Sequence, residues 1–288
     1  MPQNIDNGGN VMKKFKIGLQ LFSVRDEMDK DFEGTLKKVS EMGYEYVEFA
    51  GYYGKTAEEI NEILDKYNLK AISVHQNYEF FIGEDAQKNV DFLKTIGAEY
   101  AAIPWMGLEK HKGTDLYEQT VNDIKKVADL LSKNGIQLLY HNHEFEFKKY
   151  EDKFYLEWLL EDTQGKMLPE LDTCWVHYAG NIPQEYMLKY KGKLPVVHLK
   201  DFECKQFMAG PVYGLIDESG KEMKNNTRED NGFEFRPVGD GKQDVAAILK
   251  AAEECGSEYI IVEQDGFTGI EPMDAVKKSR DYLKSLGQ

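Results

Sequence analysis

A repeated alternation of short apolar runs and longer amphipathic segments extends through this chain from Phe15 to its end. Eight apolar runs occur in the order FKIGLQLF, YVEFA, KAISVH, YAAIPW, IQLLYH, MLPELD, LPVVHLK and YIIVEQ. Segments with apolar residues at helical spacing lie between most of them, at 31–42, 56–67, 84–96, 114–134, 243–255 and 271–286. Strands that alternate with helices predict a parallel sheet with right-handed crossovers.

The positions of four glycines support this division of the chain. Gly43, Gly97, Gly135 and Gly256 each stand between an amphipathic segment and the next apolar run, where a helix commonly ends. Eight strand–helix units favour a closed barrel over an open doubly wound sheet, and no GxGxxG motif follows the first strand. We therefore predict an α/β fold, a single (β/α)8 TIM barrel over residues 15–288, preceded by a flexible leader at 1–14.

One long segment breaks the alternation. Between Cys204 and Pro237 the chain is rich in Gly, Asp, Glu and Asn and shows no helical period. Because it follows the seventh predicted strand, we expect a long βα loop there, and long loops of compact domains are commonly functional.

Charge and composition limit the partners. The formal net charge is -15, which disfavours binding to a phosphate backbone. The three cysteines are far apart and suggest neither disulfides nor a CxxC metal knuckle. Neither a membrane-spanning run nor a secretory signal is evident. The sequence thus predicts a cytoplasmic protein with a small-molecule partner and no nucleic acid or membrane partner; it leaves open whether the chain forms a homo-oligomer.

Polar residues gather at the predicted carboxyl ends of the strands, where barrel enzymes carry their active sites. In chain order they include Gln20, Arg25, Glu48, His75, Trp105, His141, His143, Glu144, Glu146, Asp172, His198, Lys200, Asp201, Glu263 and Asp265.

Asp172, His198 and Glu263 end successive strands and have the oxygen and nitrogen donors that divalent cations prefer. Each also has a structural interpretation: Asp172 would cap the next turn, and His198 would be a satisfied core histidine. Glu263 is harder to explain structurally, because a carboxylate at a barrel rim needs a partner. Taken jointly they favour a metal site, whose fourth ligand should come from YHNHEFEF, residues 140–147.

Further candidates would contact a substrate. Lys200 shares strand parity with His198 and would polarise a carbonyl or hold an oxyanion, unless it is a solvated lysine at a helix entry. His75 and Trp105 would offer a hydrogen bond and a stacking face to a sugar, unless they only pack.

Six motifs in order, GLQLFSVRD, YHNHEFEF, LPELDTCWV, VVHLKD, VGDGKQD and IIVEQD, resemble the sugar phosphate isomerase/epimerase family of xylose-isomerase-like TIM barrels, in its YHNH branch. The resemblance implies one divalent metal ion (Mn, Co, Zn or Mg) held by a Glu, Asp, His, Glu set. Asp172, His198 and Glu263 match the last three ligands. For the first ligand, Glu146 is favoured and His143 is the main alternative, whereas a plain count from Gly135 puts His141 at the strand end.

The first ligand also decides the expected chemistry. Glu146 and Glu263 together would form the two-base site of an isomerase or epimerase that moves a proton next to a carbonyl through a metal-bound enediolate. A histidine in the first position would instead suit a lyase or dehydratase acting on a keto sugar such as a 3-keto glycoside or an inosose. In either case Gln20, His75, Trp105, His141 and His143 are expected to bind substrate, and Lys200 to assist catalysis.

The sequence disfavours two other functions. The resembled family includes DNA-cleaving barrels like endonuclease IV, but these need more histidines than this rim has, and the negative charge opposes DNA binding. A sugar-binding protein without catalysis would not need the rim carboxylates.

Overall fold

A computed structural model describes residues 13–207 and 231–288 of the chain. Eight parallel strands form a closed barrel, which β1 and β12 complete by pairing Leu19 with Val262. The barrel strands are β1 (Lys16–Gln20), β2 (Tyr46–Phe49), β3 (Lys70–His75), β4 (Tyr100–Ile103), β5 (Gln137–His141), β8 (Met167–Asp172), β9 (Val196–Leu199) and β12 (Tyr259–Val262). Each lies within one of the eight apolar runs, so the predicted barrel is confirmed.

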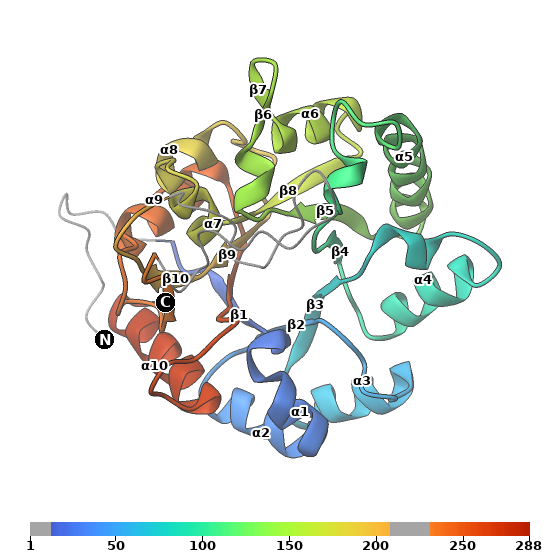
Figure 1. Cartoon of the computed structure of the whole chain (residues 1–288). Coiled ribbons are helices and arrows are strands. Elements are labelled where there is room, and N and C mark those ends of the chain that lie inside the picture. The colour runs from blue at the N-terminus through green and yellow to red at the C-terminus, as the bar shows by residue number, and fades with distance from the viewer. Residues whose placement is uncertain (1–12, 208–230) are drawn as a thin grey trace.

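Helices surround the barrel (Figure 1). They are α1 (Arg25–Lys30), α2 (Phe32–Glu41), α3 (Ala57–Lys66), α4 (Ala86–Thr95), α5 (Tyr117–Lys133), α6 (Tyr155–Asp162), α7 (Thr173–Tyr178), α8 (Pro183–Leu188), α9 (Val245–Cys255) and α10 (Pro272–Ser285). The sequence supplies their ends: Thr56 and Glu59 form a capping box at α3, and Gly256 ends α9 with a φ of 80°. The sequence pattern did not reveal α6, α7 and α8, because helices of 6 to 8 residues are too short to show a clear period.

The barrel interior is apolar at its amino-terminal end and polar at its carboxyl end. Ile72, Ala102, Leu139, Val196, Tyr259 and Ile261 form an internal apolar cluster. Two residues beyond three of these, on the same strand face, stand His141, His198 and Glu263. The apolar cluster therefore forms the floor beneath the polar residues.

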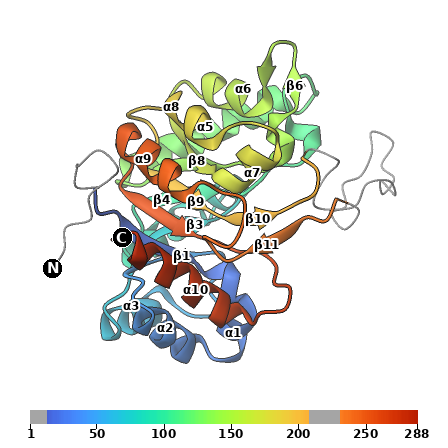
Figure 2. The same cartoon turned by 90° about the vertical axis from the view of Figure 1, so that its left-hand side faces the viewer.

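A short antiparallel ribbon follows the seventh barrel strand. It pairs β10 (Asp201–Glu203) with β11 (Glu234–Arg236) and lies beyond the carboxyl ends of the barrel strands (Figure 2). The ribbon and α7 share an apolar cluster of Cys174, Trp175, Tyr178, Phe202, Cys204, Phe233 and Phe235. β10 directly precedes the expected loop at 204–237 and β11 lies at its end, while residues 208–230 of that loop lie outside the described structure. A second hairpin pairs β6 (Lys149–Tyr150) with β7 (Lys153–Phe154).

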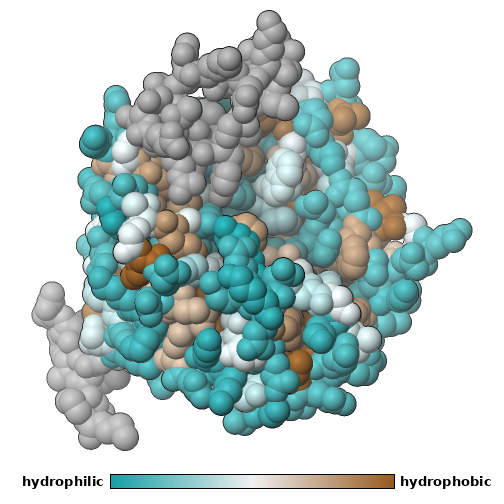
Figure 3. Space-filling view, turned by 60° about the horizontal axis from the view of Figure 1, so that its bottom comes forward, coloured by the Kyte–Doolittle hydropathy of each residue, from teal (hydrophilic) through white to brown (hydrophobic). Residues whose placement is uncertain are grey.

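The expected leader at 1–14 falls outside the described residues except for Lys13 and Lys14. All three cysteines are buried and unpaired with each other. Among the described helices, none is both long and apolar enough to span a bilayer. On the face seen in Figure 3, hydrophobic side chains form small, separate areas among hydrophilic ones.

Candidate metal centre

Four buried side chains meet where β5, β8, β9 and β12 reach the carboxyl end of the barrel. They are His141, Asp172, His198 and Glu263, here called the upper cluster, and each offers one donor atom within 4.8 Å of the others. His141 Nε2 is 3.3 Å from Asp172 Oδ2 and 3.7 Å from Glu263 Oε2. His198 Nδ1 is 3.0 Å from Glu263 Oε2.

These atoms fit a divalent cation in both chemistry and spacing. Two imidazole nitrogens and two carboxylate oxygens suit zinc, manganese or cobalt. Metal–ligand bonds of about 2.0–2.2 Å require ligand atoms roughly 3–3.6 Å apart, close to the separations found here. His141 Nε2 is buried and makes no well-directed hydrogen bond within the described structure, so a cation would satisfy it.

Asp172 serves two purposes at once. Its Oδ1 accepts hydrogen bonds from Cys174 N at 2.8 Å and Trp175 N at 3.2 Å, which caps α7. Its Oδ2 faces the upper cluster. Burial acts to raise the pKa of Asp172, but Lys200 and His141 outweigh it and lower this pKa to about 2. The capping and site interpretations from the sequence are therefore compatible.

Lys200 neutralises much of this negative charge. Its Nζ lies 3.0 Å from each of three carboxylate oxygens, Asp172 Oδ2, Glu263 Oε2 and Asp265 Oδ2, and the side chain is buried. It also lies 5.1 Å from the centre of the Trp175 ring. Lys200 therefore points inward with His198, as their shared strand parity allows, and is not a solvated lysine.

Glu146 is not part of the upper cluster. The chain turns into a 3-10 helix, η4 (Glu144–Phe147), soon after β5 ends. There Glu146 accepts hydrogen bonds from Tyr140 Oη at 2.7 Å and His143 N at 2.6 Å. Burial raises the pKa of Glu146 to about 8. The structure thus corrects the expected grouping: His141 stands with Asp172, His198 and Glu263, as the count from Gly135 indicated, and Glu146 braces the turn.

His143 lies beside the cluster without joining it. Its ring stacks on Phe145 at 5.3 Å and on Trp175 at 5.6 Å, and meets the edge of His141 at 5.1 Å. Burial is the main cause that holds the pKa of His143 well below its usual range. His143 is therefore placed to contact a substrate rather than to complete the four-residue set.

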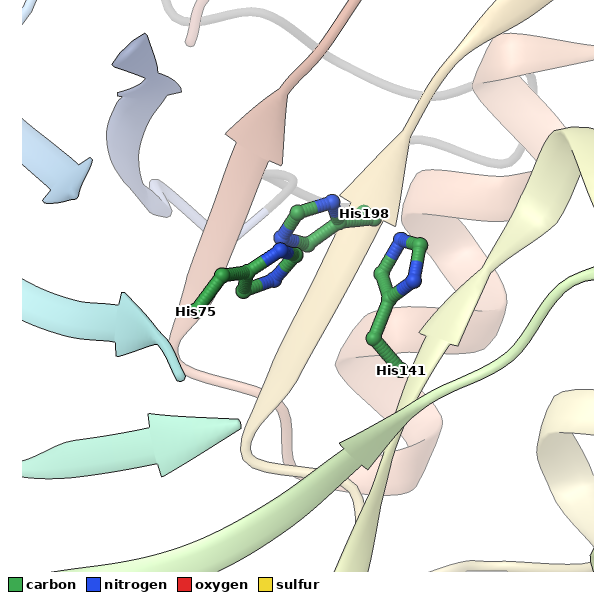
Figure 4. Close-up of side chains that lie close together, drawn as sticks. All are labelled: His75, His141 and His198. Carbon is green, nitrogen blue, oxygen red and sulfur yellow. The ribbon is translucent and has the colours of Figure 1, made fainter. Parts of the chain in front are cut away.

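A second group of side chains lies against the other side of His198. It comprises Glu48, His75, Glu170 and His198, here called the lower cluster. His198 Nε2 is 2.6 Å from Glu48 Oε2, and His75 Nε2 is 2.8 Å from Glu170 Oε2. The rings of His75 and His198 are stacked with 12° between their planes. His141 lies beside them (Figure 4). Sequence reasoning missed Glu170, although its place two residues before Asp172 puts it on the same strand face.

Gln20 is fully buried, and both groups of its side-chain amide form hydrogen bonds within the protein. Its amide donates to Glu48 Oε2 at 2.7 Å, and its oxygen accepts from Phe22 N at 3.0 Å. The expected direct contact between Gln20 and a substrate is therefore not supported by the geometry.

A cavity of about 500 Å³ opens above the two clusters. Its lining residues are Phe22, Ala50, His75, Pro104, Trp105, His141, His143, Phe145, Lys200, Glu263 and Asp265. The Trp105 side chain is 52% exposed and Phe22 39%, so both present aromatic surface at the mouth. Apolar walls with a few convergent polar groups are typical of small-molecule sites.

Known proteins share this architecture. The chain is 22% identical to an inosose dehydratase of Clostridium botulinum (strain Alaska E43 / Type E3) in an alignment 301 positions long, which covers 94% of this chain and 97% of the relative. An inosose dehydratase of Clostridium beijerinckii (strain ATCC 51743 / NCIMB 8052) is 24% identical over 280 residues, 89% of this chain and 90% of the relative. The crystal structure of a sugar phosphate isomerase/epimerase from Parabacteroides distasonis ATCC 8503 superposes with a TM-score of 0.71 at 21% identity, covering 96% of this chain and 98% of that one. The family model described as xylose isomerase-like TIM barrel matches residues 36–286, and the chain belongs to that family.

Proposed function

We propose that this protein is a divalent-metal-dependent lyase of the dehydratase type, which removes water from a cyclic keto sugar or keto polyol. The observation that carries this proposal is the position of His141. Because His141, and not a glutamate, stands with Asp172, His198 and Glu263, only one carboxylate of the upper cluster, Glu263, also lines the cavity. One carboxylate base suits removal of a proton from one side of a substrate better than the exchange between two faces that epimerisation needs.

The upper cluster would hold the cation. When bound, the cation supplies Lewis-acid polarisation of the substrate carbonyl, which acidifies the adjacent C–H group. Mn, Co, Zn or Mg would each suit a mixed set of nitrogen and oxygen donors, with magnesium the least favoured because two ligands are imidazoles.

Glu263 and Lys200 would carry the proton transfers. The Glu263 pKa is held well below its usual range, because Lys200, His141 and His198 together outweigh the effect of burial, so the carboxylate is ionised and able to accept a proton. Glu263 takes the proton next to the carbonyl, a carbon–carbon double bond forms, and the hydroxyl on the next carbon leaves. Lys200 gives that hydroxyl a proton, so that it departs as water.

The pair can then reset itself. Lys200 Nζ and Glu263 Oε2 are 3.0 Å apart, so the proton gained by Glu263 can return directly to Lys200. The net change is the loss of one water from the substrate, with both side chains restored.

The names of the relatives agree with this proposal. Two curated relatives that match along nearly their whole length are inosose dehydratases. An inosose is a cyclic ketone that bears hydroxyl groups next to its carbonyl, which is the substrate class inferred here.

An isomerase or epimerase is the second candidate. It is favoured by the sugar phosphate isomerase/epimerase among the structural neighbours and requires a second proton carrier in the cavity. Lys200, His143 and Asp265 all line the cavity, and one of them would fill that role.

Incubation in D2O separates these candidates. Purified protein loaded with Mn²⁺ or Co²⁺ would be mixed with a panel of inososes and keto sugars and followed by NMR and mass spectrometry. A dehydratase yields a product that has lost one water, a hydroxy-enone or its 1,2-diketone tautomer. Deuterium incorporation without loss of water would favour the isomerase or epimerase, and the absence of both across the panel would contradict an enzyme of either class.

A further inference from the structure

The lower cluster holds His198 from the side opposite the upper cluster. We propose that Glu48 is a positioning residue that fixes the proton of His198 on Nε2 and so presents Nδ1 to the divalent cation. This inference rests on the proposed metal site, and it assigns a role to a buried carboxylate that does not line the cavity.

The tautomer follows from the contacts of His198. Glu48 Oε2 lies 2.6 Å from Nε2, and the same oxygen accepts a hydrogen bond from the Gln20 amide at 2.7 Å. An oxygen held in this acceptor role places the proton of the contact on Nε2. Nδ1 faces the upper cluster, 3.0 Å from Glu263 Oε2. With one ring proton fixed on Nε2, Nδ1 is the nitrogen that would bind a cation in place of that contact. A carboxylate behind a metal-binding histidine typically fixes ring orientation in this way.

Glu48 is itself held in place through neighbouring strands. Residues Gln20 and Glu48 are paired in register between β1 and β2, and the Gln20 amide donates to Glu48 Oε2 at 2.7 Å. The Gln20 oxygen is fixed in turn by Phe22 N. A continuous series of hydrogen bonds therefore connects the backbone after β1 to the His198 ring.

The distances indicate hydrogen bonds, and not a second metal site, in the lower cluster. The shortest contacts are 2.6 Å between His198 and Glu48 and 2.8 Å between His75 and Glu170. Two atoms bound to the same tetrahedral cation would lie about 3.3 Å apart, given metal–ligand bonds near 2.0–2.1 Å. Charge-assisted hydrogen bonds of 2.6–2.8 Å match the observed separations better.

Glu170 offers a matched comparison. It is equally buried and belongs to the same cluster, but its Oε2 is 3.4 Å from His198 Nε2, beyond a strong hydrogen bond. Removing the charge of Glu170 changes the electrostatics around His198 much as removing the charge of Glu48 does. Only the loss of Glu48 removes the short hydrogen bond that orients the His198 ring.

The test is a Co²⁺ titration of chelator-stripped protein, followed by the visible spectrum of the bound ion. Wild type, Glu48→Gln, Glu48→Leu and Glu170→Gln would be compared, with the melting temperature of each metal-free protein as a check on folding. We expect one Co²⁺ per chain in wild type. Affinity should fall about 10–100-fold in Glu48→Leu and less in Glu48→Gln, whose amide oxygen still accepts from Nε2, and by no more than about threefold in Glu170→Gln. The Co²⁺ spectrum should change in both Glu48 variants only.

Equal losses in the Glu48→Leu and Glu170→Gln proteins would overturn the positioning role, because the loss of charge alone would then explain both. Two Co²⁺ ions per chain in wild type would also overturn it and make the lower cluster a metal site. If Glu48→Leu does not fold, the Co²⁺ spectra of the two glutamine variants still decide: a spectrum unchanged in Glu48→Gln, or changed equally in both variants, would overturn the role. A wild-type protein that binds no Co²⁺ would contradict the proposed metal centre itself, which is a different failure.

Discussion

His141 Nε2 lies 3.3 Å from Asp172 Oδ2, at the end of the barrel where the neighbouring strands β5 and β8 both terminate. The residue that β5, the fifth barrel strand, contributes to the upper cluster is therefore a histidine. It also leaves Glu263 as the one carboxylate of that cluster that lines the cavity, which is why dehydration is favoured over epimerisation.

Replacing Lys200 with Met should slow catalysis strongly. The change removes the proposed proton donor and an ammonium group that lies 3.0 Å from Glu263 Oε2. We expect kcat to fall by about 10²–10⁴-fold, the range of general acid catalysis, while bound metal persists. Steady-state kinetics and metal analysis measure this. Lys242→Met, which removes a more exposed ion pair with Glu203, serves as the control; a Lys200→Met enzyme within threefold of wild type would refute the role.

Replacing Trp105 with Ala should weaken substrate binding with little effect on stability. The ring lines the cavity and is 52% exposed, so its removal leaves no buried hole. KM should rise several-fold while kcat stays close to wild type. Leu116→Ala is a suitable control, because Leu116 is 49% exposed and does not line the cavity. A selective fall in kcat would instead place Trp105 in the chemistry.

Removing the Tyr140 hydroxyl should destabilise the fold. Tyr140→Phe deletes a buried 2.7 Å hydrogen bond to Glu146 Oε1. The expected loss in unfolding free energy is about 1–3 kcal/mol, measured by urea denaturation. Tyr67→Phe deletes a similar bond to the exposed Glu33 and should cost much less. Equal losses in the two variants would contradict this, because the buried hydrogen bond between Tyr140 and Glu146 would then stabilise the fold no more than an exposed one.

The stability of the protein should depend on pH through Glu146. Burial raises its pKa from 4.5 to about 8 in the folded state, so folding favours the protonated form. That stabilising effect is complete below pH 4.5 and is lost as the pH rises towards 8. The side chain of the Glu146→Gln protein stays neutral at every pH. The unfolding free energy of this variant, relative to that of wild type, should therefore rise by on the order of a few kcal/mol between pH 5 and 8.5. Urea denaturation at both pH values tests this, and a constant difference between the two proteins would refute it.

Much of the fold could be predicted from the sequence because apolar runs mark buried parallel strands. The strand ends at His198 and Glu263 followed directly, since a residue two positions beyond a buried strand residue keeps its face. The ribbon of β10 and β11 could not be predicted, because strands of three residues leave no recognisable pattern.

The first position of the upper cluster was harder to predict for a physical reason. Strand alternation assigns faces only within a strand, and β5 ends at His141. The residues that follow form a 3-10 turn, which directs Glu146 towards Tyr140. The resemblance favoured Glu146 by its place in the motif, whereas the plain residue count from Gly135 found His141.

Metal binding by chelator-stripped protein tests the proposed centre most directly. Mn²⁺ or Co²⁺ would be titrated into wild type, His141→Ala and Glu146→Gln, with the ratio of bound ion to chain as the readout. We predict one ion per chain in wild type and in Glu146→Gln, and a loss of affinity of about 100-fold or more in His141→Ala, which lacks one ligand. No bound ion in wild type, or wild-type affinity in His141→Ala with loss in Glu146→Gln, would contradict the centre described here.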